Sequence, residues 1–145
     1  MSSGTYRYTT WDDIESCVTA LARKIADKNF KFQSISTVSR GGLVPARLVA
    51  DRLNIKQILV DPDTIPGDSL FVDDIYDTGE TFRKMMQRAD DSDDIVYATL
   101  IARKKRNYPK QLIYGQLTDG DEYVVYPWDR FEHGMPNAHK TTASF

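Results

Sequence analysis

Two adjacent carboxylates, Asp73 and Asp74, follow a run of residues, SLFV, whose apolar character is typical of a buried strand. Directly after them comes a turn rich in threonine and glycine, residues 77–81, which leads into a helical pattern. Open α/β sheets bind ligands at the carboxyl ends of their strands. The N–H groups and hydroxyls of such a turn can hold an anion. The sequence therefore predicts a ligand site at residues 73–81.

The combination of carboxylates and an anion-binding turn limits the chemical class of ligand that could bind there. Asp73 and Asp74 would repel a phosphate, so they must face hydroxyl groups or a metal ion. A sugar phosphate with free hydroxyls satisfies both halves of the site. The alternative is that the two aspartates end a strand and that residues 77–79 form an ordinary turn.

The remaining pattern supplies elements that would position this site. An apolar face at helical spacing, residues 14–25, follows Thr10 and Asp13, which have the spacing of a capping box. Further helices are predicted from Pro45 to about Leu53 and after Thr81. The predicted strands are residues 35–39, 57–60, 69–72, 95–102, 111–115 and 123–126. This alternation predicts an α/β fold, a mostly parallel twisted sheet flanked by helices.

Composition narrows the class of protein. The 145 residues fit one domain, residues 1–145, with a polar segment, 133–145, expected to be flexible. A net charge of −2 argues against a nucleic-acid partner. No apolar run approaches the roughly 20 residues that span a bilayer, and no signal peptide is evident, so we expect no membrane partner and a cytoplasmic location.

Two other features have simple interpretations. Cys17, the single cysteine, falls on the apolar face of the first helix and is expected in the core rather than in catalysis. The acidic run at 90–94 is predicted to be a solvated loop. A calcium site there stays open, although the glycine and distal glutamate of an EF-hand loop are absent.

Four segments of the chain carry a family resemblance. Residues 72–81, VDDIYDTGET, resemble the 5-phosphoribosyl-1-pyrophosphate motif of type I phosphoribosyltransferases. Residues 38–45, VSRGGLVP, resemble the pyrophosphate loop of the bacterial xanthine-guanine phosphoribosyltransferase family. TWD at 10–12 and PWD at 127–129 also resemble that 6-oxopurine branch. The resemblance implies the type I fold, with a small hood formed by the N- and C-terminal segments.

The resemblance also implies site roles, position by position. Ribose hydroxyls would be held by Asp73 and Asp74, and magnesium (Mg²⁺), the implied cofactor, by Asp74 and Asp129. Asp77 would handle the proton of a purine ring nitrogen and, as the catalytic residue, also border the 5-phosphate. The other implied 5-phosphate residues are Thr78, Gly79, Glu80 and Thr81, and the pyrophosphate residues are Ser39, Arg40 and Gly41, with a cis peptide before the arginine.

The purine pocket follows less directly from the resemblance. Arg103 occupies the position of a lysine that contacts the exocyclic oxygen of the purine, with Lys104 as the alternative in a shifted register. The run 103–106 could equally be a solvated strand end. Tyr123 is placed to stack on the purine, or to pack on the sheet, and Val124 or Val125 would offer backbone groups to the base edge.

One departure from the family stands out. A long loop that closes over the site in the family corresponds here to only residues 61–68, which contain two prolines and a glycine. The resemblance implies a purine salvage enzyme that joins activated phosphoribose to a 6-oxopurine, in a homodimer or homotetramer. The short loop keeps a rival open, a non-catalytic sensor that binds a nucleotide or the activated sugar. A branch acting on orotate is weakened by the PWD match.

Overall fold

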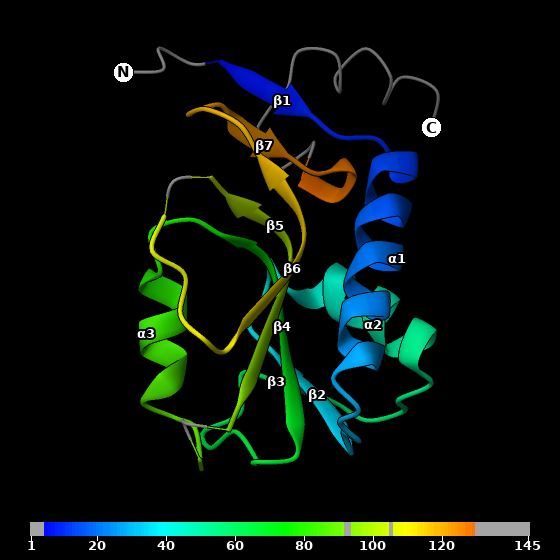
Figure 1. Ribbon diagram of the computed structural model, residues 1–145, viewed down its shortest axis with the longest axis vertical. Coiled ribbons are helices and arrows are strands. Elements are labelled where there is room, and N and C mark those ends of the chain that lie inside the picture. Colours follow the sequence, from blue (N-terminus) through cyan, green and yellow to red (C-terminus); the bar gives the residue numbers. More distant parts are fainter. Residues whose placement is uncertain (1–4, 92–93, 105, 130–145) are drawn as a thin grey trace.

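The computed structural model describes residues 5–91, 94–104 and 106–129 and contains two parallel sheets (Figure 1). The larger sheet has the strand order β3-β2-β4-β5-β6, and all four of its strand pairs are parallel. The strands are β1 (Tyr6–Tyr8), β2 (Ser34–Thr37), β3 (Ile58–Val60), β4 (Ser69–Tyr76), β5 (Val96–Arg103), β6 (Leu112–Thr118) and β7 (Tyr123–Val125). The helices are α1 (Trp11–Asp27), α2 (Leu43–Leu53), α3 (Glu80–Met86) and the 3-10 turn η1 (Pro127–Asp129).

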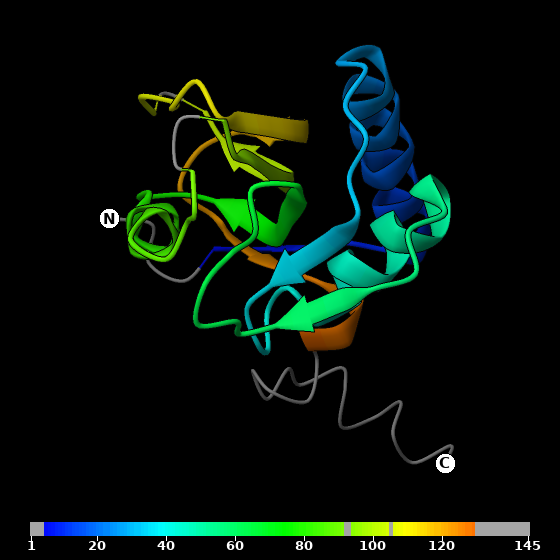
Figure 2. The same cartoon turned by 90° about the horizontal axis from the view of Figure 1, so that it is seen from below.

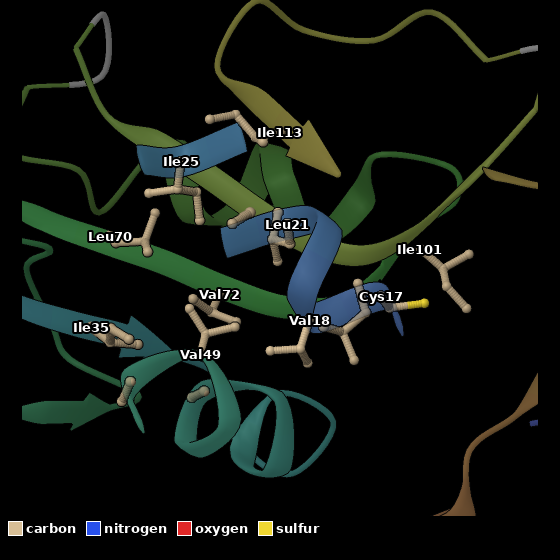
Figure 3. Close-up of a cluster of buried hydrophobic side chains, with 14 of the residues drawn as sticks. Cys17, Val18, Leu21, Ile25, Ile35, Val49, Leu70, Val72, Ile101 and Ile113 are labelled. Carbon is tan, nitrogen blue, oxygen red and sulfur yellow. The ribbon is translucent and has the colours of Figure 1, made fainter. Parts of the chain in front are cut away.

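Helices cover both faces of the larger sheet. α1 and α2 lie on one face, and α3 lies on the other (Figure 2). Side chains from α1 and α2 meet Leu70 and Val72 of β4 in one core (Figure 3). Phe71 and Tyr97 point to the opposite face, where they pack with Met85 of α3. The central strands of the sheet are therefore buried on both sides, as is typical of a parallel sheet. The predicted α/β fold class is confirmed.

The first helix forms for the reasons that its sequence suggests. The Thr10 hydroxyl accepts a hydrogen bond from the Asp13 N–H at 3.1 Å, and the Asp13 carboxylate accepts one from the Thr10 N–H at 2.8 Å. The apolar side chains at helical spacing are all buried against the sheet. Cys17 is among them, and burial raises the pKa of its thiol to about 11. The residue is thus a core side chain.

Several predicted boundaries differ from the structure, including the end of the strand at 111–115, which continues to Thr118 as β6. β4 does not end before the aspartates but continues to Tyr76, because Ile75 and Tyr76 still pair with β5. α2 begins at Leu43, two residues before the proline that was expected to open it. α3 was expected after Thr81, but it begins at Glu80 and ends at Met86. The site residues keep their order but lie on a longer strand.

The two terminal segments of the described chain pair with each other. β1 and β7 form a two-stranded parallel sheet in the register Tyr6 with Tyr123. This small sheet lies beyond one end of the five-stranded sheet (Figure 1). The Tyr126 hydroxyl, directly after β7, donates a 2.9 Å hydrogen bond to the carbonyl of Asp74 at the end of β4. We call β1, β7 and η1 the hood, and it stands over the carboxyl ends of the central strands.

Some expectations concern residues that the structure does not describe. The polar segment 133–145 lies outside the described residues, as do two members of the acidic run at 90–94. Within the described residues, none of the helices has the length and apolar character needed to cross a membrane.

Candidate active site

Two hollows open at the carboxyl ends of the central strands, and Asp74 lines both of them. The first, of about 330 Å³, is formed by residues 73–82 together with Tyr97, and we call it the phosphate-loop hollow. The second, of about 490 Å³, is the hood hollow; its lining includes Arg40, Gly41, Tyr123, Trp128 and Asp129. This end of a parallel sheet is where ligands bind in α/β proteins.

Asp73 is held at the border of the phosphate-loop hollow by two hydrogen bonds. Its Oδ1 accepts from the N–H of Asp74 at 2.8 Å, and its Oδ2 accepts from the hydroxyl of Tyr97 at 3.2 Å. The residue is only 5% exposed. Burial therefore raises the pKa of the Asp73 carboxyl above its ordinary value, against the opposing effect of these hydrogen bonds.

Asp74 lies between the two hollows and faces the pyrophosphate loop. Its Oδ1 accepts a hydrogen bond from the N–H of Ile75 at 2.7 Å. A Cβ added at Gly41 would lie 3.2 Å from Oδ2, so glycine lets the loop backbone approach the carboxylate. Burial, followed by the negative charges of Asp73 and Asp129, raises the pKa of Asp74 well above its ordinary value. Among the described residues no salt bridge compensates either carboxylate.

The turn after β4 has the shape of an anion-binding loop. Gly79 has φ of +86°, and a Cβ there would lie 2.7 Å from the Tyr76 hydroxyl, so the position requires glycine. The Thr78 hydroxyl accepts a 3.3 Å hydrogen bond from the N–H of Glu80, and the Glu80 carboxylate pairs with Lys84 at 3.1 Å. The predicted 5-phosphate residues, Thr78 to Thr81, thus form the turn and the first residues of α3, and they line the hollow.

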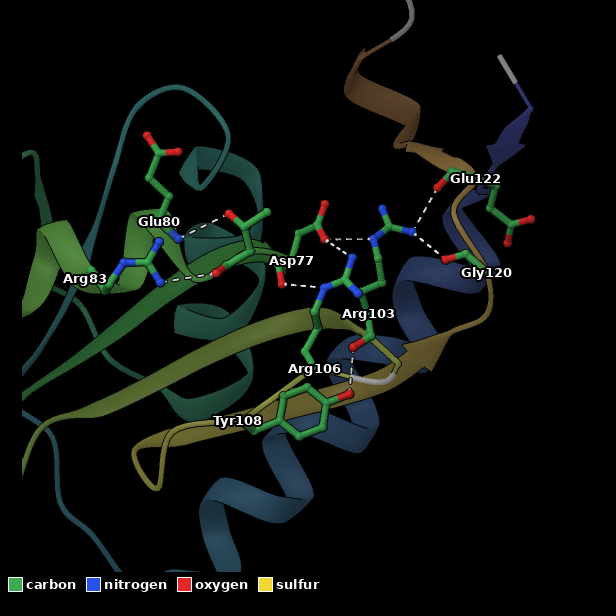
Figure 4. Close-up of polar contacts among 9 residues, drawn as sticks. Asp77, Glu80, Arg83, Arg103, Arg106, Tyr108, Gly120 and Glu122 are labelled. Carbon is green, nitrogen blue, oxygen red and sulfur yellow. Dashed lines mark hydrogen bonds and ion pairs between the residues drawn. The ribbon is translucent and has the colours of Figure 1, made fainter. Parts of the chain in front are cut away.

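Asp77 is held by two arginines. The Nε of Arg103 and the Nη2 of Arg106 each lie 3.0 Å from the same carboxylate oxygen, Oδ1 (Figure 4). Arg106 also donates from Nε to the backbone carbonyl of Asp77 at 3.1 Å. Positive charge therefore surrounds one side of this carboxylate, in contrast to Asp73 and Asp74.

Arg103 reaches the site from the last position of β5. Its Nη1 donates to the carbonyls of Gly120 at 3.1 Å and Glu122 at 3.0 Å, which anchor the guanidinium under the hood (Figure 4). Lys104, the alternative in the shifted register, pairs instead with Asp119. The structure thus brings Arg103, and not Lys104, to Asp77.

The pyrophosphate loop is the turn between β2 and α2. The peptide bond between Ser39 and Arg40 is cis, as the resemblance implied. The Asp61 carboxylate accepts hydrogen bonds from both the N–H of Ser39, at 3.0 Å, and its hydroxyl. These bonds lower the pKa of Asp61. Arg40 and Gly41 line the hood hollow, whereas Ser39 is turned towards Asp61.

The predicted base-binding residues of the hood divide into exposed and buried side chains. Tyr123 is 47% exposed and lines the hood hollow, and its ring centroid lies 5.8 Å from that of Tyr6. The Val124 side chain is buried in the core. Tyr123 and Val125 bond to the segment that contains β1, so the N–H and carbonyl of Val124 lie on the opposite side of the strand. Asp129 lines the same hollow as Tyr123.

Sequence comparison finds relatives of the kind that the resemblance implies. No protein-family model matches the chain. It is 27% identical over 140 residues to the xanthine-guanine phosphoribosyltransferase of Chromohalobacter salexigens, covering 83% of this chain and 82% of the relative. The enzyme of the same name from Desulfotalea psychrophila is 29% identical over 146 residues, covering 83% and 84%.

Solved structures extend the comparison to the fold. The xanthine-guanine-hypoxanthine phosphoribosyltransferase of Helicobacter pylori aligns with a TM-score of 0.71 and 15% identity, covering 89% of this chain and 97% of that one. The purine phosphoribosyltransferase of Pyrococcus horikoshii gives 0.65 and 23% identity, covering 83% and 91%. The fold is that of a phosphoribosyltransferase. The predicted resemblance of the chain to type I enzymes of the xanthine-guanine kind is confirmed.

The phosphoribosyltransferase fold of this chain has a short connection between β3 and β4. In residues 61–68, Ile65 is fully buried and bonds through its backbone to Arg88 and Asp90 on the α3 side of the sheet. The connection is therefore pinned to the body of the protein and does not extend over either hollow. This agrees with the sequence-based prediction of a tight turn in place of a lid.

Three polar contacts of the site were not predicted. Arg106 was considered only as a member of a basic run, Asp61 only as a turn residue, and Tyr97 only as part of a strand. Each reaches a predicted site residue across more than 20 positions of the chain, since the separations are 29, 22 and 24 residues. The basic run after β5 was the one available signal, because charge at a strand's carboxyl end points to the ligand side of the sheet.

Proposed function

We propose that the protein is a purine phosphoribosyltransferase of the xanthine-guanine kind. It would transfer ribose 5-phosphate from 5-phosphoribosyl-1-pyrophosphate to guanine, xanthine or hypoxanthine and release pyrophosphate. The observation that carries this proposal is the strand–turn–helix unit at residues 69–86. It presents three aspartates and an anion-binding turn in a chain that is similar along more than four-fifths of its length to curated enzymes of that name.

The end of β4 would hold the sugar. Asp73 and Asp74 would accept hydrogen bonds from the ribose hydroxyls, and the turn Thr78–Gly79–Glu80–Thr81 would surround the 5-phosphate through its N–H groups and hydroxyls. Asp74 lines both hollows, so a sugar bound there would direct its pyrophosphate towards the loop that contains Ser39, Arg40 and Gly41. The Arg40 guanidinium would offset the charge of the leaving group.

The donor set fits magnesium that is bound together with the sugar. Mg²⁺ is commonly bound by one or two carboxylates plus substrate phosphates and keeps several waters. Asp74 and Asp129 line the same hollow, and the buried negative charge around Asp74 would be relieved by a cation. No cluster of three ligating side chains occurs in the parts of the chain that the structure describes. When bound, magnesium would neutralise charge on the pyrophosphate.

The purine would lie between the hood and Asp77. Tyr123 would stack on the ring, the backbone of Val124 would contact the base edge, and Arg103 would donate to the exocyclic oxygen. As the purine nitrogen bonds to the anomeric carbon, the bond to pyrophosphate breaks. Asp77 would accept the proton that leaves the five-membered ring. Positioning and charge neutralisation would supply most of the rate, because the transition state is expected to resemble an oxocarbenium ion.

The rival hypothesis, a sensor without catalytic activity, depends on the short connection between β3 and β4. A lid excludes water from an active site, and residues 61–68 do not provide one. The similarity to curated enzymes favours catalysis over the sensor. The hood would then be the main cover of the site. Assembly into a homodimer or homotetramer stays a prediction, which size-exclusion chromatography with light scattering can measure.

A direct assay tests the proposed function. The protein is incubated with magnesium and 5-phosphoribosyl-1-pyrophosphate, and guanine, xanthine, hypoxanthine, adenine and orotate are offered separately. Nucleotide and pyrophosphate are expected in equal amounts with one or more of the 6-oxopurines, and not when the magnesium is chelated. Binding of the sugar without turnover of any base would support the sensor instead.

A further inference from the structure

The side chain of Arg106 donates two hydrogen bonds to Asp77. Its Nη2 donates to Oδ1 of Asp77 at 3.0 Å, and its Nε donates to the carbonyl of Asp77 at 3.1 Å (Figure 4). The two bonds fix both the side chain and the backbone of that residue. Without them the Asp77 side chain, which is 40% exposed, would be held by Arg103 alone.

The segment that carries Arg106 is itself fixed on both sides. The Tyr108 hydroxyl donates to the carbonyl of Arg103 at 2.7 Å, and the Tyr76 hydroxyl donates to the carbonyl of Asn107 at 3.2 Å. The rings of Tyr76 and Tyr108 also meet edge to face, with centroids 6.0 Å apart. The guanidinium of Arg106 is thus held against Asp77 before any ligand arrives.

The two arginines on Asp77 are not equivalent. Arg103 is anchored elsewhere, by the carbonyls of Gly120 and Glu122, and touches Asp77 only through Nε. Its anchor therefore does not depend on Asp77. Both arginines bind Oδ1, and Oδ2 of Asp77 has no hydrogen bond to any described residue. Oδ2 is the oxygen available to accept a proton.

We propose that Arg106 is a positioning residue, which holds Asp77 so that its Oδ2 faces the purine. Arg103 would then donate to the exocyclic oxygen of the purine. This inference rests on the proposed function. Arg106 would act only through Asp77, by fixing the acceptor of the proton. A fixed acceptor matters because a displacement of about 1 Å can lower a rate on the order of 100-fold.

A kinetic double-mutant cycle tests this role. The variants are Arg106→Gln, Arg106→Lys, Asp77→Asn and Arg106→Gln with Asp77→Asn. The control is Arg47→Gln, which removes an exposed arginine that pairs with Asp51 on α2. Arg106→Gln is expected to lower the single-turnover rate about 10- to 100-fold, with a change below about 3-fold in the KM for the sugar. Arg106→Lys should restore part of the rate, since lysine keeps the charge but not the two-pronged geometry.

The double variant distinguishes positioning from general damage. If Arg106 acts through Asp77, adding Arg106→Gln to Asp77→Asn should change the rate by less than about 2-fold. Multiplicative losses in the double variant, or a wild-type rate for Arg106→Gln, would overturn the role of Arg106 while the wild-type activity still supports the proposed function. No turnover of any base by the wild-type protein would overturn the proposed function, and this role with it.

Discussion

The three carboxylates at the end of β4 stand in two different electrostatic environments within five residues of chain. Asp73 and Asp74 are buried together, and burial raises the pKa of each. Asp77 lies on the turn beyond the strand, with two guanidinium groups 3.0 Å from one of its oxygens. Among the described residues no salt bridge involves Asp73 or Asp74, whereas Asp77 pairs with two arginines. In the proposed function, Asp73 and Asp74 would hold the sugar and a cation, and Asp77 would accept the proton.

The largest effect is expected from removing the charge of the buried pair. Asp73→Asn combined with Asp74→Asn should weaken binding of the activated sugar at least about 100-fold, because hydrogen bonds to charged groups contribute about 1.5–3 kcal/mol each. Asparagine can still accept from the backbone N–H groups that the carboxylates bind, so the fold should survive. Calorimetry measures the affinity, and circular dichroism controls for folding. An unchanged affinity would show that the sugar binds elsewhere.

Asp77→Asn should separate chemistry from binding. General acid–base catalysis typically contributes about 10²–10⁴-fold, so the single-turnover rate should fall by about that factor. Affinity for the activated sugar should change less than about 3-fold, since the variant keeps the size of the side chain and the backbone of the turn. Rapid-quench kinetics and calorimetry measure the two quantities. A wild-type single-turnover rate would assign the proton to another group.

Arg103→Gln should affect the base more than the sugar. Loss of a charged donor is expected to raise the KM for the purine by about 10-fold or more, given the 1.5–3 kcal/mol typical of such bonds. Lys104→Gln is the matched control, because Lys104 pairs with Asp119. Steady-state kinetics at saturating sugar measure both. Equal effects of the two variants would remove Arg103 from the purine pocket.

The smallest predicted effect concerns stability. The folded protein binds a proton at Asp74 more tightly than the unfolded chain, because its pKa is raised above 3.8. Stability from this group is full below that value and falls as the pH rises towards the raised pKa. Asp74→Asn should therefore stabilise the ligand-free protein at pH 7, because asparagine carries no charge that burial would penalise.

Thermal melts at two pH values check this stability prediction. The variant should melt at a higher Tm than the wild type at pH 7, and this gain should largely disappear at about pH 4. A loss of stability at pH 7, or a gain that does not depend on pH, would mean that the buried charge does not destabilise the protein.

The sequence was sufficient for the parts of the site that depend on local pattern. The helix at residues 11–27 followed from its apolar spacing and its cap, and the ligand end of the sheet followed from carboxylates after a buried run. The strand was predicted too short because aspartates are rare inside strands. Here the carboxylates of Asp73 and Asp74 bind the next N–H groups, and β4 continues to Tyr76.

The contacts that hold the side chains of the site in place could not be predicted from the sequence. Arg106 reaches Asp77 only because the connection after β5 passes beside the turn after β4, and tyrosines hold it there. Asp61 reaches Ser39 because β3 and β2 are neighbours in the sheet. Both depend on the path of the chain in three dimensions, which local propensity does not encode.

Proton release on binding of the activated sugar measures the difference between the two carboxylate environments most directly. Calorimetric titrations at saturating magnesium, in buffers of different ionisation enthalpy, give the number of protons released. Wild-type protein should release protons on binding, and the number released should fall as the pH is raised, because the raised pKa values of Asp73 and Asp74 favour a bound proton in the free site. The release should persist in Asp77→Asn and decrease in Asp73→Asn. A release that is lost in Asp77→Asn, or is unaffected by Asp73→Asn, would contradict the assignment of the two environments.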